Sequence, residues 1–238
     1  MHSETTSRHR VTRKRVIPKP LGNLSSRERI IYAASLLIEK RGFHGAGLNE
    51  IVHKAKAPKG SIYYHFPGGK EQIAAEAIAL SGRTLAERLR INWVQKQSAA
   101  AAIEAFINRL TLLLGTSRFD SSGLLSIIAS ETATTNKRLN QCCQEAFTRL
   151  IEIHREKLAD CGVNEIEAER LSTVVTAAIL GGVILSRTFH SRKPLQTIAM
   201  LFGKMLQAAD PTTKQPPRSR VGEMKTTTGK RATSRGPQ

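Results

Sequence analysis

Apolar residues recur every three to four positions along most of the chain, the period of an α-helix with one buried face. The first such stretch follows Ser25 and Glu28, which have the spacing of a capping box, and ends at Gly42, a natural left-handed cap. A second helix of about two turns begins at Leu48. Pro58, which suits the first turn of a helix, predicts a third helix from that residue.

Pro67 ends the third helix, and a long fourth helix is expected from Lys70 to about residue 94. Further helical patterns cover residues 98–115, 122–130, 136–160, 165–189 and 194–208. No segment has a convincing strand pattern. We therefore predict an all-α protein, with an N-terminal three-helix helix-turn-helix domain followed by a helical body.

The third helix has a polar face suited to DNA. Ile62 and Phe66 are four residues apart and should pack inward. Lys59, Ser61, Tyr64 and His65 then face outward, with no acid among them. Two short helices joined by a tight turn, the second bearing such residues, are typical of a recognition helix in the major groove.

These segments resemble the DNA-binding domain of the TetR family of bacterial regulators over about residues 25–75. The matching positions are Gly42-Phe43, Leu48-x-x-Ile51 and Lys59-Gly60-Ser61-Ile62-Tyr63-Tyr64-His65-Phe66-x-x-x-Lys70-Glu71. The Phe66-Pro-Gly-Gly-Lys70 variant further resembles the multidrug- and flavonoid-responsive branch, the LmrA/YxaF-like regulators. Two positions depart from the family pattern: Lys56 replaces a small residue in the turn, and Ala46-Gly47 replaces a Thr before the second helix.

The resemblance implies that two sets of side chains contact different parts of the DNA: some hold phosphates and others lie near base edges. The implied phosphate contacts are Tyr63, Tyr64, His65 and Lys70, and the residues near bases are Lys59, Gly60 and Ser61. We also expect Asn49, on the exposed face of the second helix, to contact DNA.

Recognition helices of this kind act in dimers, so the body must supply an interface. Ala178, Gly182 and Ser186 recur at every fourth position and would let another helix approach closely. Together with Leu195 and Phe202 they are expected to form half of a four-helix dimer interface, as the resemblance also implies. The alternative is a packing face within one chain.

The family resemblance further implies a pocket for a small apolar effector between the fourth helix and the body. The residues predicted to line it are Phe106, Phe119, Ile127, Phe147 and Ile151, each of which also suits an ordinary core. An effector acts only if it prefers one conformation of the dimer.

The formal charge of +18 lies largely at the two ends. Residues 1–24 and 211–238 carry six and seven Lys or Arg residues against one acid each, in sequences too polar to form a core. The predicted organisation is a disordered basic arm (1–24), the DNA-binding domain (25–70), a ligand-binding and dimerisation domain (71–209) and a disordered basic tail (210–238). No secretory signal or membrane-length apolar run is evident, so the expected compartment is the cytoplasm.

No enzyme constellation is apparent, since Cys143 and His154 are not on one turn and the cysteines lack metal-site spacing. We expect no metal and no cofactor. The main hypothesis is a homodimeric repressor that leaves a palindromic operator on double-stranded DNA when it binds a small apolar effector. Activation of transcription and regulation without a ligand stay open as alternatives. The alternative is a basic architectural protein that binds DNA through its arms without sequence preference.

Overall fold

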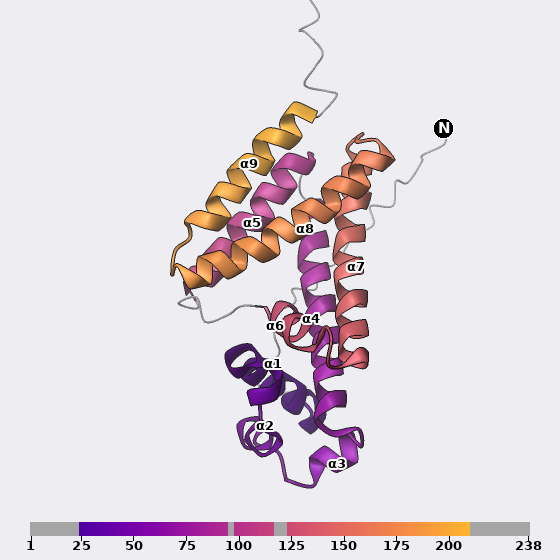
Figure 1. The fold of residues 1–238 in the computed structure, drawn as a ribbon, viewed down its shortest axis with the longest axis vertical. Coiled ribbons are helices and arrows are strands. Elements are labelled where there is room, and N and C mark those ends of the chain that lie inside the picture. The colour runs from indigo at the N-terminus through magenta and orange to yellow at the C-terminus, as the bar shows by residue number, and fades with distance from the viewer. Residues whose placement is uncertain (1–23, 95–97, 117–122, 210–238) are drawn as a thin grey trace, which may run out of the picture.

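The computed structural model describes residues 24–94, 98–116 and 123–209, which are helices and turns without strands (Figure 1). This confirms the all-α prediction. The basic arm and tail predicted at the termini lie outside the described residues. The helices are α1 (Ser26–Gly45), α2 (Leu48–Ala55), α3 (Ser61–His65), α4 (Gly69–Val94), α5 (Ala99–Thr116), α6 (Leu124–Thr132), α7 (Lys137–Asp160), α8 (Glu165–Thr188) and α9 (Lys193–Ala209).

The capping box predicted at the start of α1 is confirmed. The Ser25 hydroxyl accepts a hydrogen bond from the Glu28 backbone N–H at 3.2 Å, and the Glu28 carboxylate accepts one from the Ser25 N–H at 2.8 Å. Gly42 has φ 78°, so regular helix is interrupted there as predicted. The last residues of α1 form a separate short turn that directs the chain toward α2.

The turn between α2 and α3 keeps its left-handed geometry although a lysine occupies the critical position. Lys56 has φ 50°, and its N–H donates to the His53 carbonyl at 3.1 Å. The third helix begins at Ser61 and not at Pro58 as predicted. The Ser61 N–H donates to the Pro58 carbonyl at 2.9 Å, which closes residues 58–61 into a tight turn before the helix.

The first three helices form a small head at one end of the molecule, and α4 runs from the head into the body (Figure 1). In the body α4 packs along α7, and α5 packs along α9, while α8 lies against α7 and α9. Ile73, Ile78 and Leu89 of α4 are fully buried, so one core continues from head to body.

Within the residues that the structure describes, two helices are long and apolar enough to cross a membrane by length and composition alone. They are Ala99–Thr116 and Glu165–Thr188, with mean hydropathies of 1.3 and 1.5. Both pack against other helices of the body, and their buried positions belong to the common core. Such composition is also found in core helices of soluble proteins, so it is weak evidence for a membrane span.

Candidate nucleic-acid interface and interior cavity

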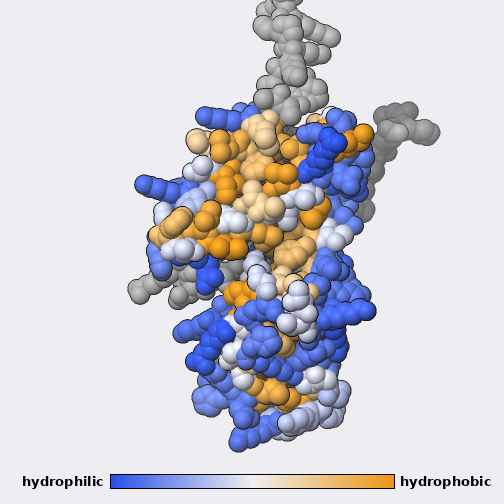
Figure 2. Space-filling view, in the orientation of Figure 1, coloured by the Kyte–Doolittle hydropathy of each residue, from blue (hydrophilic) through white to orange (hydrophobic). Residues whose placement is uncertain are grey.

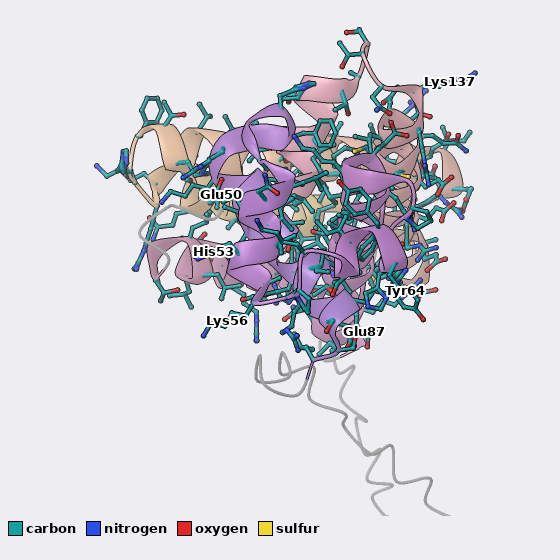
Figure 3. All side chains as sticks on the ribbon, turned by 90° about the horizontal axis from the view of Figure 1, so that it is seen from below. Glu50, His53, Lys56, Tyr64, Glu87 and Lys137 are labelled. Carbon is teal, nitrogen blue, oxygen red and sulfur yellow. The ribbon has the colours of Figure 1, made fainter. Side chains whose placement is uncertain are left out.

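The recognition surface is built by α3 and the turn before it. Ile62 and Phe66 are buried in the head, as their spacing predicts. Tyr63 and Tyr64 are 73% and 83% exposed. Figure 3, viewed from the head end, shows Tyr64 on the opposite side from His53 and Lys56. Large aromatic side chains left this exposed on a three-helix domain indicate a contact surface.

Basic side chains lie on α2 and on the turn between α2 and α3. His53, Lys54, Lys56 and Lys59 are exposed, and none pairs with an acid in the part of the chain that the structure describes. The nearby Glu50 is neutralised by Arg41, at 2.7 Å between carboxylate and guanidinium. The net field over the α2–α3 turn is therefore positive, as phosphate binding requires.

The other predicted DNA contacts are accessible to different degrees. Asn49 and Gly60 are exposed, and a Cβ at Gly60 would meet no atom within 4 Å, so helix packing does not account for this glycine. Ser61 and His65 are half-buried. The Lys70 ammonium donates to the His44 carbonyl at 3.2 Å and lies 4.8 Å over the Phe43 ring, and burial lowers the pKa of Lys70. Lys70 therefore also ties α4 to the end of α1.

A cavity of about 1420 Å³ opens between α1 and the helices of the body. Several of the large apolar side chains that line it are exposed: Tyr32, Leu36, Leu80 and Leu113. Of the residues predicted to line a pocket, Phe106 does so, whereas Ile127, Phe147 and Ile151 are not among the lining residues. Phe119 lies outside the described residues. The contribution of α1 was not predicted, because its amphipathic pattern indicates only burial.

Helix α6 connects this cavity to the head. At its start, the Gly123 N–H donates to Glu39 of α1 at 3.1 Å, and both residues line the cavity. Burial raises the pKa of Glu39. At its end, Glu131 accepts hydrogen bonds from the backbone N–H groups of Phe43 and His44, at 2.7 and 3.3 Å. Sequence reasoning missed these acids because their partners are backbone groups far away in the chain.

Glycine at position 42 is required by this contact as well as by its positive φ. A Cβ at Gly42 would collide with the Glu131 carboxylate. The glycine therefore serves both to end the helix and to admit Glu131 to the two N–H groups that follow. The result is a close link between α6 and the turn that leads into α2.

The residues predicted for the dimer interface lie mostly inside the single chain. Gly182, Ser186, Leu195 and Phe202 are buried, and Ala178 is half-buried. A Cβ at Gly182 would lie 2.7 Å from Leu195, so this small residue admits α9 of the same chain. Other apolar side chains of α8 and α9 are exposed, and those near the contact between the two helices include Ile184, Leu185, Met200, Leu201 and Met205. Figure 2 shows apolar surface over this part of the body and a mostly hydrophilic head.

An exposed, basic helix-turn-helix head joined to a helical body with an interior cavity is the architecture of a DNA-binding transcriptional regulator. Comparison with known proteins identifies the family. Residues 30–77 match the model of "Bacterial regulatory proteins, tetR family", and residues 99–200 match "Transcriptional regulator LmrA/YxaF-like, C-terminal domain". The chain belongs to the TetR family, and it is a regulator and not an enzyme.

Individual relatives agree with this assignment. The chain is 37% identical to the HTH-type transcriptional regulator LmrA of Bacillus subtilis, over 76% of this chain and 97% of LmrA. It is 35% identical to the uncharacterised regulator YxaF of the same organism, over 73% and 91%. A TetR regulator from Legionella pneumophila shares the fold, with a TM-score of 0.69 and 22% identity over 77% of this chain and 99% of that one. The resemblance to the LmrA/YxaF-like branch is thus confirmed.

Proposed function

We propose that the protein is a cytoplasmic, homodimeric repressor that leaves a palindromic operator when a small apolar effector fills the cavity. The observation that carries this proposal is the position of the cavity, whose walls come from α1 of the head and from the body. A molecule bound there touches both parts at once. It therefore stabilises one arrangement of head and body relative to others, as an allosteric ligand must.

The proposed DNA contacts are Tyr63, Tyr64 and His65 on phosphates, with Lys59, Gly60 and Ser61 close to base edges. Exposure and positive charge on this face support these roles. Asn49 and Lys70 are proposed as flanking contacts. Lys70 would reach a phosphate while keeping its ammonium near the His44 carbonyl, since an ammonium has three donors.

The proposed dimer interface is the outward apolar face of α8 and α9, defined by Ile184, Leu185, Met200, Leu201 and Met205. Exposed apolar patches of this kind mark interaction sites, and a two-fold dimer buries the same patch of both subunits. The residues first expected there, Ala178, Gly182, Ser186, Leu195 and Phe202, would support this face from beneath by holding α8 against α9. Leu201→Glu should give monomers in sedimentation experiments, with helical content unchanged.

Helix α6 is the proposed connection between effector and DNA. An effector that displaces residues 123–126 at the cavity wall would move the whole short helix, and Glu131 at its far end would pull on the turn before α2. The Bacillus subtilis regulator FadR, which shares the fold with a TM-score of 0.60 and 19% identity over 75% of this chain and 96% of that one, was solved in complex with stearoyl-CoA. Phe106 remains a proposed effector contact.

The experiment measures anisotropy of a labelled operator duplex, selected from a random-sequence pool by the protein itself, during titration with a panel of apolar small molecules. Compounds that release DNA from the wild type are repeated on Leu113→Trp, which fills the cavity, and on Leu112→Trp, its matched control. The two leucines are adjacent and exposed, but only Leu113 lines the cavity. Release of DNA on addition of the compound should be lost in Leu113→Trp and kept in Leu112→Trp. Equal release from both variants would contradict the cavity as the effector site.

A further inference from the structure

Two polar side chains interrupt the buried part of the cavity wall. They are His154 of α7, which is 2% exposed, and Thr176 of α8, which is 6% exposed. The other buried lining residues are apolar: Ile31, Ala77, Leu89, Phe106, Leu114, Leu124, Leu125, Leu150 and Ile179. A buried polar group among apolar neighbours needs a hydrogen-bond partner, so the partners of His154 are informative.

The hydrogen bonds around His154 determine which ring nitrogen carries the proton. Nδ1 lies 3.2 Å from the Thr176 hydroxyl oxygen, and that hydroxyl donates its hydrogen to the Ser172 carbonyl at 2.8 Å. Because a hydroxyl has a single hydrogen, the Thr176 oxygen must accept from Nδ1–H. Burial lowers the pKa of His154 to about 4, so the ring is neutral at physiological pH.

Nε2 is therefore a hydrogen-bond acceptor, and it has no partner among the described residues. Next to it lies Trp93, with the two ring centroids 5.1 Å apart, and the Trp93 Nε1–H also lacks a partner. The unmatched acceptor belongs to a residue that lines the cavity, whereas Trp93 packs against His154 and is not among the lining residues. A hydroxyl group in the cavity would offer the hydrogen that Nε2 lacks.

We propose that His154 Nε2 is the recognition point of the cavity, and that it accepts a hydrogen bond from the O–H or N–H of a neutral, otherwise apolar effector such as a phenol. This inference rests on the effector cavity of the proposed function. An acceptor at Nε2 discriminates among apolar molecules. An ether has no hydrogen to donate to it, and the negative charge of a carboxylate is repelled by its lone pair. Discrimination of this kind is strong because the alternative leaves a buried acceptor unpaired.

Binding also has to move a ring. Nε2 is covered by its neighbours in the structure. The His154 imidazole or the Trp93 indole must therefore turn toward the cavity when the effector binds. Trp93 is the single tryptophan of the chain, so its indole N–H gives one nuclear magnetic resonance signal that reports this movement.

The test compares para-propylphenol with its methyl ether, para-propylanisole, by titration of the full-length protein followed through the Trp93 indole signal. The phenol should bind about 10-fold more tightly, the effect of one hydrogen bond to a buried acceptor. The extra methyl group of the ether biases affinity the other way, which strengthens the comparison. His154→Phe should remove the preference, and the exposed His53→Phe should retain it.

Equal affinities in the wild type, or a preference that survives in His154→Phe, would overturn the recognition role of His154 and leave the cavity intact. If neither compound binds, both this inference and the effector cavity are contradicted. If His154→Phe does not fold, nitrogen-15 spectra of histidine-labelled wild-type protein provide the test. They should show Nε2 without a proton, and the Nε2 signal should shift with the phenol but not with the ether. A proton on Nε2 overturns the inference.

Discussion

The contact between Glu131 and the end of α1 yields a quantitative prediction. The carboxylate accepts a short hydrogen bond of 2.7 Å from the half-buried Phe43 N–H and a longer one of 3.3 Å from His44. A hydrogen bond to a charged group contributes about 1.5–3 kcal/mol, and only the shorter bond is expected to contribute fully. Glu131→Ala should therefore lower the free energy of unfolding by about 2 kcal/mol. Glu131→Gln keeps a neutral acceptor and should lose about half as much.

Urea unfolding followed by circular dichroism measures this effect, at a fixed protein concentration because a dimer's stability depends on it. With a slope of roughly 2 kcal/mol per molar urea, the midpoint of Glu131→Ala should fall by about 1 M. The control is Glu156→Ala, at an exposed position of α7, which should change stability by less than about 0.5 kcal/mol. If Glu131→Ala behaves like the control, the contact does not hold the head to α6.

The same variants test the proposed route from effector to DNA. Glu131→Ala should retain operator affinity in the absence of effector within a few fold, because no DNA contact is removed. The change in operator affinity on adding effector should shrink, since α6 no longer pulls on the turn before α2. An unchanged response would show that the signal travels by another path, such as α4.

Three further predictions concern the head and the body. Tyr64→Ala should weaken operator binding about 30-fold in a gel-shift assay, since a dimer loses two contacts of about 1 kcal/mol each; a normally folded variant with wild-type affinity would contradict the docking. Lys56→Gly should raise the free energy of unfolding by roughly 0.5–1 kcal/mol by relieving the left-handed lysine, whereas Lys54→Gly inside α2 should lower it by about 1 kcal/mol. His154 should make stability pH-dependent: its pKa is about 4 when folded against 6.5 in the unfolded chain, so stability is complete above pH 6.5 and falls toward pH 4. Between pH 7 and 5 the loss should be about 2 kcal/mol in urea titrations and absent in His154→Gln.

Local patterns predicted the helices well because their signals lie close together in the sequence. Ser25 and Glu28 define the start of α1 within four residues, and the positive φ of Gly42 ends its regular part. The start of α3 was misplaced because Pro58 is equally suited to a tight turn, and the Ser61 N–H to Pro58 carbonyl bond decides between the two. Whether the helix begins at Pro58 or one turn later, at Ser61, depends on how the segment packs against the rest of the head.

The cavity and the subunit surface were harder to predict. Gly182 was correctly read as a position of close helix approach, but the sequence does not say whether the approaching helix belongs to the same chain. Ile127, Phe147 and Ile151 have the apolar character of pocket residues and still lie away from the cavity. His154 offered a usable signal, since it occupies a core position between Leu150 and Leu158 on the buried face of α7, where a polar residue is unusual.

As a dimer, the helix-turn-helix head should bind one specific DNA sequence in preference to others. The most direct measurement recovers fragments of sheared genomic DNA, from a bacterium that carries the gene, with the purified wild-type protein and with Tyr64→Ala at near-physiological salt. Fragments that share a palindrome should be enriched by the wild-type protein, and this enrichment should be lost in the variant. Recovery of the same unselected fragments by both proteins would contradict this expectation and favour a basic architectural protein that binds DNA without sequence preference.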